Sequence, residues 1–111
     1  MKSLEDIDIF HTLEYIKITA PKYAEAKANR VYLEEWRKSL KSKIMTEDMT
    51  GSVAQQERNA YAHPEYVQLL DGLKVAVEEE EKLKWMLIAA QAMINCWQTL
   101  SANERAERKL I

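Results

Sequence analysis

The stretch from Pro64 to Leu110, PEYVQLLDGLKVAVEEEEKLKWMLIAAQAMINCWQTLSANERAERKL, predicts one long helix. Apolar and small side chains recur at alternating intervals of four and three residues, once Glu80 is counted: Leu69, Leu73, Ala76, Leu83, Leu87, Ala90, Ile94 and Trp97. Such a spacing averages about 3.5 residues and keeps one side of a helix turned towards a partner helix. We place the helix over residues 64–108.

A second apolar stripe begins after the glutamates of this helix: Met86, Ala89, Met93, Cys96 and Leu100. The section from Trp85 to Leu100 is therefore apolar over more than half of its circumference, which indicates burial by several neighbours. At 1.5 Å per residue, roughly 40 residues form a rod of roughly 60 Å, more than the rest of the chain covers, so we expect a homo-oligomer. The residues expected at the interface between copies are Leu83, Trp85, Leu87, Ala90, Ile94 and Trp97.

The composition favours a single helical domain. Of the 111 residues, 47% are hydrophobic and 31% are charged, as in a folded protein. Only two glycines and two prolines are present, whereas a sheet protein needs turn residues about every eight to twelve positions. We expect residues 1–111 to form one all-α domain, elongated, with two long helices and one or two short ones, assembling through the apolar C-terminal helix.

The N-terminal part of the chain predicts two helices separated near a proline. Residues 1–18 read as an arm or a short helix, which Thr12 can cap and which Pro21 would end. Thr19 fits the cap of a second helix over residues 20–45, because proline is tolerated in the first turn of a helix.

A loop over residues 46–52 separates this helix from the next one. Ser52 followed by Gln55 fits a capping box, which predicts a helix over residues 53–62. Pro64 fits the first turn of a helix and not its interior, so we place a break just before it, where the long helix begins.

The net charge is −2, but it is unevenly distributed. Residues 22–45 carry seven basic and three acidic side chains, and residues 82–111 carry five basic and two acidic ones. Between them, residues 46–81 carry two basic and nine acidic side chains. The chain thus contains two basic segments separated by an acidic one.

The chain has few residues suited to catalysis or to metal binding. His11 and His63 have no second strong ligand at a metal-binding spacing, and one cysteine forms neither an intramolecular disulfide nor a Cys-based zinc site. Cys96 lies among apolar residues, which predicts an inert core thiol. We expect no enzymatic activity, no catalytic residue, no metal and no cofactor.

The sequence also predicts a protein that does not enter membranes. No apolar run reaches the ~18 residues that a membrane span requires. No signal peptide with an apolar core and a cleavage site is recognisable. We expect a cytoplasmic location.

Four consecutive glutamates, Glu78 to Glu81, stand within the long helix. Successive helical residues point about 100° apart, so adjacent carboxylates do not converge on one ion. A solvated face paired with Lys82 and Lys84 is the expected arrangement. Glu80 alone falls on the first apolar stripe, where it either ends the dry core or faces a cation on another helix.

The helix over residues 20–45 is a candidate nucleic-acid surface, because Lys and Arg hold phosphates and aromatic rings stack on unpaired bases. Tyr32 and Trp36 lie near its basic residues. The residues expected to contact single-stranded DNA are Arg30, Arg37, Lys38, Lys41, Lys43, Arg58 and Tyr61. Several copies in one oligomer would strengthen weak phosphate contacts through avidity.

Three stretches also share an order with a known family. YAEA at residues 23–26 leads into YLEEW at residues 32–36, AQQERNAY follows at residues 54–61, and LKWMLIAA stands at residues 83–90. Over most of residues 20–105, this order resembles, distantly, the recombination mediator proteins of bacteriophages, of the UvsY type. Small helical phage proteins of uncharacterised role have a still closer layout.

The resemblance implies a non-enzymatic, homo-oligomeric factor that binds single-stranded DNA and remodels its coat of single-strand-binding protein. Such a mediator helps to load a recombinase. If it is encoded by a phage, it acts in the cytoplasm of the host cell. Of the family's DNA-contacting middle segment only Arg58 and Tyr61 match, because Gln55, Gln56 and Glu57 stand before them. The C-terminal helix resembles the family's assembly element.

The sequence is therefore compatible with two functions. In the first, a recombination mediator, the partners are single-stranded DNA, further copies of the chain, a recombinase and a single-strand-binding protein. The alternative is a helical phage adaptor or regulator that acts only through protein–protein contacts, using its acidic residues 46–81 against a basic partner. The clustered lysines favour the first function, and the isoelectric point of about 5.7 favours the second.

Overall fold

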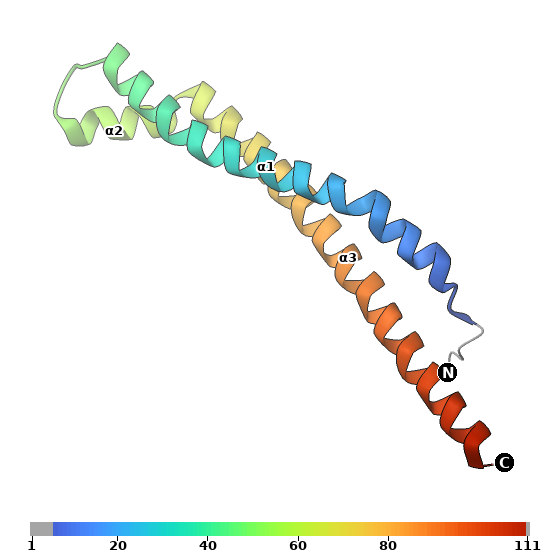
Figure 1. The fold of residues 1–111 in the computed structure, drawn as a ribbon. Helices are drawn as coiled ribbons and strands as arrows, with labels where there is room; N and C mark the ends of the chain where they lie inside the picture. Colours follow the sequence, from blue (N-terminus) through green and yellow to red (C-terminus); the bar gives the residue numbers. More distant parts are fainter. Residues whose placement is uncertain (1–5, 111) are drawn as a thin grey trace. The chain divides into compact units, whose positions relative to one another are not determined.

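The computed structural model describes residues 6–110, which form three helices and no strand (Figure 1). Helix α1 spans Ile9–Glu47, α2 spans Val53–Ala62 and α3 spans Pro64–Leu110. The predicted all-α class, with two long helices and a short one, is confirmed. Within the described range, no helix has an apolar segment of the length needed to cross a bilayer.

Helix α1 is continuous, so the predicted break at Pro21 is wrong. The helix begins after Asp8, whose side-chain Oδ1 accepts the backbone N–H of His11 at 2.9 Å, as an N-cap residue does. Thr12 and Thr19, which were predicted to cap two separate helices, are buried inside this single one. Pro21 removes one backbone hydrogen bond, but the stability of a long helix comes mainly from packing, and buried residues lie on both sides of the proline. Residues 1–5 of the predicted arm lie outside the described residues.

The chain divides into two compact units, to which both long helices contribute. Residues 24–81, called here the α2 unit, contain the C-terminal part of α1, all of α2 and the first part of α3. Residues 1–23 and 82–111, called here the terminal unit, contain the remaining parts of α1 and α3.

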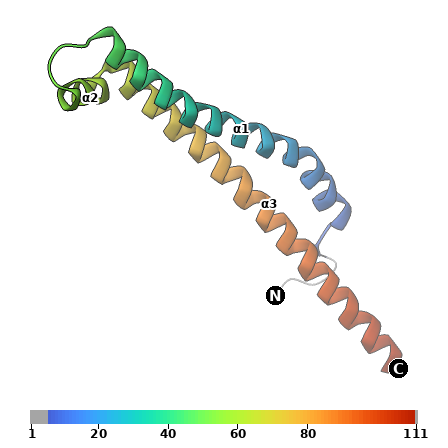
Figure 2. The ribbon, with the colours of Figure 1, turned by 60° about the vertical axis from the view of Figure 1, so that its left-hand side comes forward.

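In the α2 unit, the parts of α1 and α3 run antiparallel, and α2 lies where the chain turns back (Figures 1 and 2). Each of the three helices contributes to one buried cluster, formed by Leu40, Ile44, Ala60 and Tyr66, with Met45 and Leu69 packed against it. Leu40 and Ile44 stand four residues apart, and therefore on the same face of α1. This cluster holds α2 against both long helices.

Local signals in the sequence determine both turns of the α2 unit. The hydroxyl oxygen of Ser52 accepts the backbone N–H of Gln55 at 3.2 Å, so the predicted cap of α2 is confirmed. Gly51 before it has a φ of +79°, a left-handed conformation that glycine adopts without strain. His63 is extended, with φ −64° and ψ 135°, as expected for the residue before a proline, and Pro64 begins α3 as predicted.

In the terminal unit, the first part of α1 lies along the second part of α3. The buried side chains of this unit are small or aliphatic: Thr12, Thr19, Leu83, Ala90 and Ile94. A single neighbouring helix covers only one face of α3, so Trp85 stays 60% exposed, and Met86 and Met93 stay 43% and 44% exposed.

Candidate nucleic-acid interface

The α2 unit contains a cleft of about 320 Å³ in which basic and aromatic side chains meet. Arg37, Lys38 and Lys41 come from α1, Tyr61 from α2 and Tyr66 from α3. Four of these residues were predicted from the sequence to contact DNA, and the fold brings them together. Proteins that bind unpaired nucleotides combine cations and aromatic rings in this way.

Lys41 joins α1 to α2 in the cleft. Its ammonium donates hydrogen bonds to Glu57 Oε1 at 2.6 Å and to the hydroxyl of Tyr61 at 2.7 Å, both on α2. The hydrogen bond to Glu57, and next that to Tyr61, raises the pKa of Lys41 above its usual value. The same bond from Lys41 lowers the pKa of Glu57. Lys41 is therefore charged and held in place, and the carboxylate of Glu57 partly neutralises its charge.

Arg37 and Lys38 provide the accessible positive charge of the cleft. Lys38 pairs with Glu35 at 3.3 Å, and both side chains are 67% exposed, so water weakens this pair. Arg37 forms no ion pair with any other residue in the range 6–110. A phosphate group at the cleft would therefore compete with water more than with protein carboxylates for these two cations.

Tyr61 presents an aromatic ring at the edge of the cleft. It packs edge to face on Tyr66, with ring centroids 5.3 Å apart and an interplanar angle of 73°. Tyr66 is buried, whereas 46% of Tyr61 is exposed. The buried ring thus supports the exposed one, and the bond from Lys41 holds its hydroxyl. These two contacts orient Tyr61 in the absence of a ligand.

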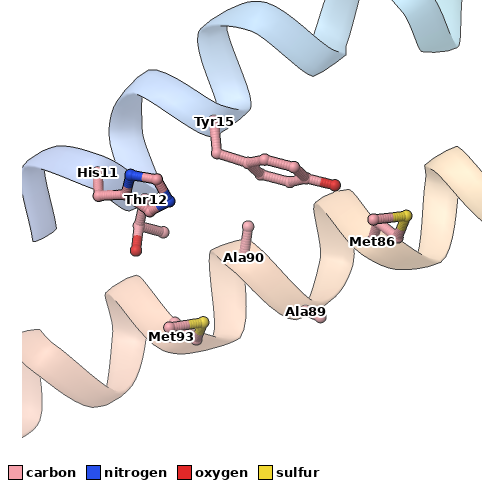
Figure 3. A pocket seen from close by; sticks show the side chains of 7 residues that line it. All are labelled: His11, Thr12, Tyr15, Met86, Ala89, Ala90 and Met93. Atoms are coloured by element: carbon pink, nitrogen blue, oxygen red, sulfur yellow. The ribbon is translucent and has the colours of Figure 1, made fainter. Parts of the chain in front are cut away.

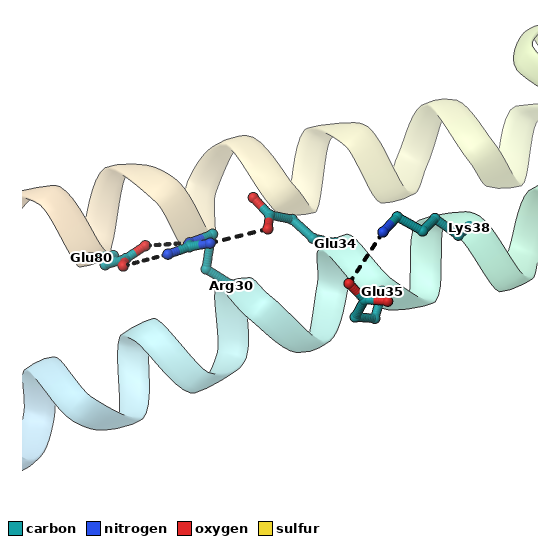
Figure 4. A network of polar contacts seen from close by, with 5 residues as sticks. All are labelled: Arg30, Glu34, Glu35, Lys38 and Glu80. Carbon is teal, nitrogen blue, oxygen red and sulfur yellow. Dashed lines mark hydrogen bonds and ion pairs between the residues drawn. The ribbon is translucent and has the colours of Figure 1, made fainter.

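Arg30 does not belong to this cleft, and its predicted role in DNA binding needs correction. Its guanidinium donates to both carboxylate oxygens of Glu80, at 2.6 and 2.9 Å, and to Glu34 at 3.0 Å (Figure 4). These bonds, that to Glu80 first, raise the pKa of Arg30. The side chains of Arg30 and Glu80 are only 23% and 9% exposed. Arg30 is engaged in joining α1 to α3, so its charge is not offered to phosphates.

The same contact decides between the two alternatives for Glu80. It faces a cation on another helix, and that helix is α1 of the same chain. A carboxylate at a buried position of the apolar stripe therefore specifies how α1 and α3 align in the α2 unit.

Two further predicted contacts lie outside the cleft. Lys43 lines a different hollow of the α2 unit, of about 560 Å³, together with Trp36, Glu65 and Gln68. Arg58 is exposed on α2, three residues before Tyr61, so it stands on the same side of that helix as the tyrosine. Arg58 therefore extends the cleft along α2, whereas Lys43 does not contribute to it.

The residues predicted to join copies of the chain need a partial correction. Leu83, Ala90 and Ile94 are buried within one copy, because α1 already covers this face of α3. Leu87 and Trp97 are half-buried, and Trp85 is mostly exposed. Cys96 was predicted to lie in the core, but it is a free, exposed thiol on the face of α3 that α1 leaves open.

Tyr66 and Glu57 belong to the site but were not identified from the sequence as part of it. Tyr66 stands on the far side of the break at Pro64, so its position relative to Tyr61 depends on the path of the chain. Glu57 lies 16 residues from Lys41, and no helical spacing relates the two. The one local signal is that Glu57 and Tyr61 are four residues apart on a helix.

No family model, curated protein or solved structure matches the chain.

Proposed function

We propose that this protein is a recombination mediator that binds single-stranded DNA as a homo-oligomer and helps to load a recombinase onto coated single strands. The observation that supports DNA binding is the meeting of Arg37, Lys38 and Lys41 with Tyr61 in one cleft. The role as a mediator rests on the resemblance of residues 20–105 to phage recombination mediators.

The cleft suits the backbone of a single strand. Arg37 and Lys38 contact phosphates, and each contact releases a counterion, so affinity falls as salt rises. Lys41 acts mainly through Tyr61, whose hydroxyl it holds. One such site is small, and weak binding at one copy becomes strong when several copies engage one strand.

Tyr61 favours unpaired over paired nucleotides. A base stacks on an exposed aromatic ring only when it is not held in a duplex, and such stacking is tolerant of sequence. Arg58, on the same side of α2, would contact the next phosphate along the strand. We expect a preference for single strands with little dependence on base sequence, as a factor that acts on coated single strands requires.

The test is fluorescence anisotropy of a labelled oligothymidine about 40 nucleotides long, titrated with protein from low to physiological salt, with a duplex as control. We expect preferred binding of the single strand, weakening as salt rises. Arg37→Ala and Lys38→Ala should each lower the salt slope by about one phosphate contact. Lys43→Ala removes the same charge from the same helix outside the cleft, and should leave the slope unchanged.

Absence of binding even at low salt would exclude the DNA-binding proposal. The acidic residues 46–81 would then be the place to look for a basic partner protein, and an adaptor acting only through protein contacts would be the better assignment. An equal decrease of the salt slope in Lys43→Ala and Arg37→Ala would show that the DNA does not bind in the cleft.

A further inference from the structure

The terminal unit has an apolar groove between its two helices that no side chain of the described chain fills. It has a volume of about 260 Å³ and is lined by His11, Thr12 and Tyr15 of α1 and by Met86, Ala89 and Met93 of α3. Figure 3 shows both walls, with Ala90 between the two methionines and the α1 side chains projecting towards α3. The groove is open to solvent along α3, where Met86 and Met93 remain almost half exposed.

The α3 wall of the groove continues as the second apolar stripe of the sequence. Met86, Ala89, Met93, Cys96 and Leu100 alternate three and four residues apart, the spacing of a helix that packs along another helix. This stripe is distinct from the face with Leu83, Ala90 and Ile94, which α1 covers. The exposed stripe is therefore a second packing surface, next to the first, and residues 6–110 of the same chain leave it open.

Charges of opposite sign stand at the two ends of this stripe. Lys82 precedes Met86 by four residues, and Glu104 and Glu107 follow Leu100 by four and seven, so all three extend the same side of α3. Glu78 stands on this side too, but one turn beyond Lys82 and farther from the apolar residues. Glu104 also pairs with Arg108 on its own helix. The stripe thus begins with a cation and ends with carboxylates, which gives it a direction.

We propose that α3 of a second copy docks along this stripe and over the groove, antiparallel to the first. In a parallel pair the two copies of Lys82 would lie side by side and repel each other. The two copies of Glu104 and of Glu107 would do the same. In an antiparallel pair Lys82 of each copy meets Glu104 and Glu107 of the other, at both ends at once. Met93 and Cys96 then lie near the two-fold axis, and the contact is the same for both copies, as in most symmetric dimers.

This inference rests on the proposed homo-oligomer and specifies its surface and direction. Dipolar electron spin resonance measures the direction, with single spin labels on α3 in a Cys96→Ala background that light scattering shows to retain self-association. Gln91→Cys and Lys109→Cys place the labels on the face of α3 opposite to the stripe, one near the middle of the helix pair and one near its end.

We expect a label separation below about 30 Å at position 91, because packed helices lie only 8–10 Å apart. At position 109 we expect a separation above about 40 Å, because roughly 15 residues at 1.5 Å each separate this site from the two-fold axis in each copy. Short separations at both positions would overturn the antiparallel arrangement. A monomer in light scattering, or no dipolar coupling at position 91, would overturn docking on this stripe altogether. The same labelled samples titrated against oligothymidine show separately whether DNA binding persists.

Discussion

Arg30 of α1 and Glu80 of α3 are 50 residues apart in the sequence and form a bidentate ion pair at the end of the α2 unit that is remote from helix α2. The guanidinium also reaches Glu34 one turn along α1, so three charged side chains form a single network. Because Glu80 occupies a buried position of the apolar stripe, the pair imposes one alignment of α1 on α3. Other alignments would bury this carboxylate against apolar side chains.

A double-mutant cycle measures this coupling. Arg30→Met and Glu80→Leu should each lower the melting temperature by several degrees, because each leaves a partner charge in a poorly solvated place. The double variant should be more stable than the sum of the two losses predicts. Thermal unfolding followed by circular dichroism gives the values, and additive losses would show that the two side chains do not depend on one another.

The two glycines offer a matched pair of substitutions with opposite effects. Gly51→Ala should destabilise the protein by roughly 1–2 kcal/mol, because φ is +79° there and the new methyl group would collide with the Gln55 side chain. Gly72→Ala should stabilise it by roughly 1 kcal/mol, because Gly72 lies inside α3 and its added methyl group meets nothing within 4 Å. Urea unfolding measures both, and a stabilising Gly51→Ala would contradict the turn geometry.

The salt link between Lys41 and Glu57 predicts how stability depends on pH. Glu57 has a pKa below its ordinary value of 4.5, so its stabilising effect is complete above that pH and is lost as the pH falls through the lowered value. Lys41 has a raised pKa, so its contribution is complete below 10.5 and is lost only at higher pH. Between these limits the pair should contribute a constant amount.

Glu57→Gln should therefore reduce the loss of unfolding free energy that occurs as the pH falls below about 4.5. Urea unfolding at a series of pH values measures this slope. Glu79→Gln, which removes an exposed carboxylate on α3, is the control and should leave the slope nearly unchanged. An identical slope in the wild type and in Glu57→Gln would show that Lys41 and Glu57 do not interact in solution.

The bounds of the helices could be predicted from the sequence better than the contacts between the helices. Ser52 and Pro64 act through the backbone of their immediate neighbours, so the bounds of α2 and the start of α3 followed from a few residues. The break predicted at Pro21 was wrong because it also relied on a local preference. Proline does favour the start of a helix, but packing on both sides of Pro21 keeps α1 continuous.

The candidate site was predictable by residue type and only partly by position. Arg37, Lys38 and Lys41 share one helix, and their neighbourhood could be inferred from spacing. The pairing of Arg30 with Glu80 and the support of Tyr61 by Tyr66 join residues from different helices, which periodicity does not relate. Periodicity also showed that the first apolar stripe of α3, which contains Ile94, faces a partner helix. It did not show that this partner is α1 of the same chain.

Tyr61 gives a prediction for the stacking contribution to DNA binding. Tyr61→Ala should weaken binding of oligothymidine about tenfold, within the range measured for loss of one stacked base. Tyr61→Phe keeps the ring and loses only the hydroxyl held by Lys41, so it should bind within a few-fold of the wild type. Tyr32→Ala removes an exposed tyrosine of α1 outside the cleft and serves as the control. Equal effects of Tyr61→Ala and Tyr32→Ala would argue against stacking in the cleft.

Charge reversal tests the antiparallel pairing of α3 without a label. Lys82→Glu would place carboxylates opposite Glu104 and Glu107 of the other copy at both ends of the helix pair, and should weaken self-association about tenfold, equivalent to about 1.4 kcal/mol. Adding Glu107→Lys to the same chain restores opposite charges at both ends and should recover most of the loss. In a parallel pair Lys82→Glu only exchanges one like-charged contact for another, so sedimentation equilibrium would show little change and no recovery. Recovery of self-association in the double variant therefore indicates an antiparallel pair, and its absence indicates a parallel one. A charge that only lies on the surface of a monomer would not produce such recovery.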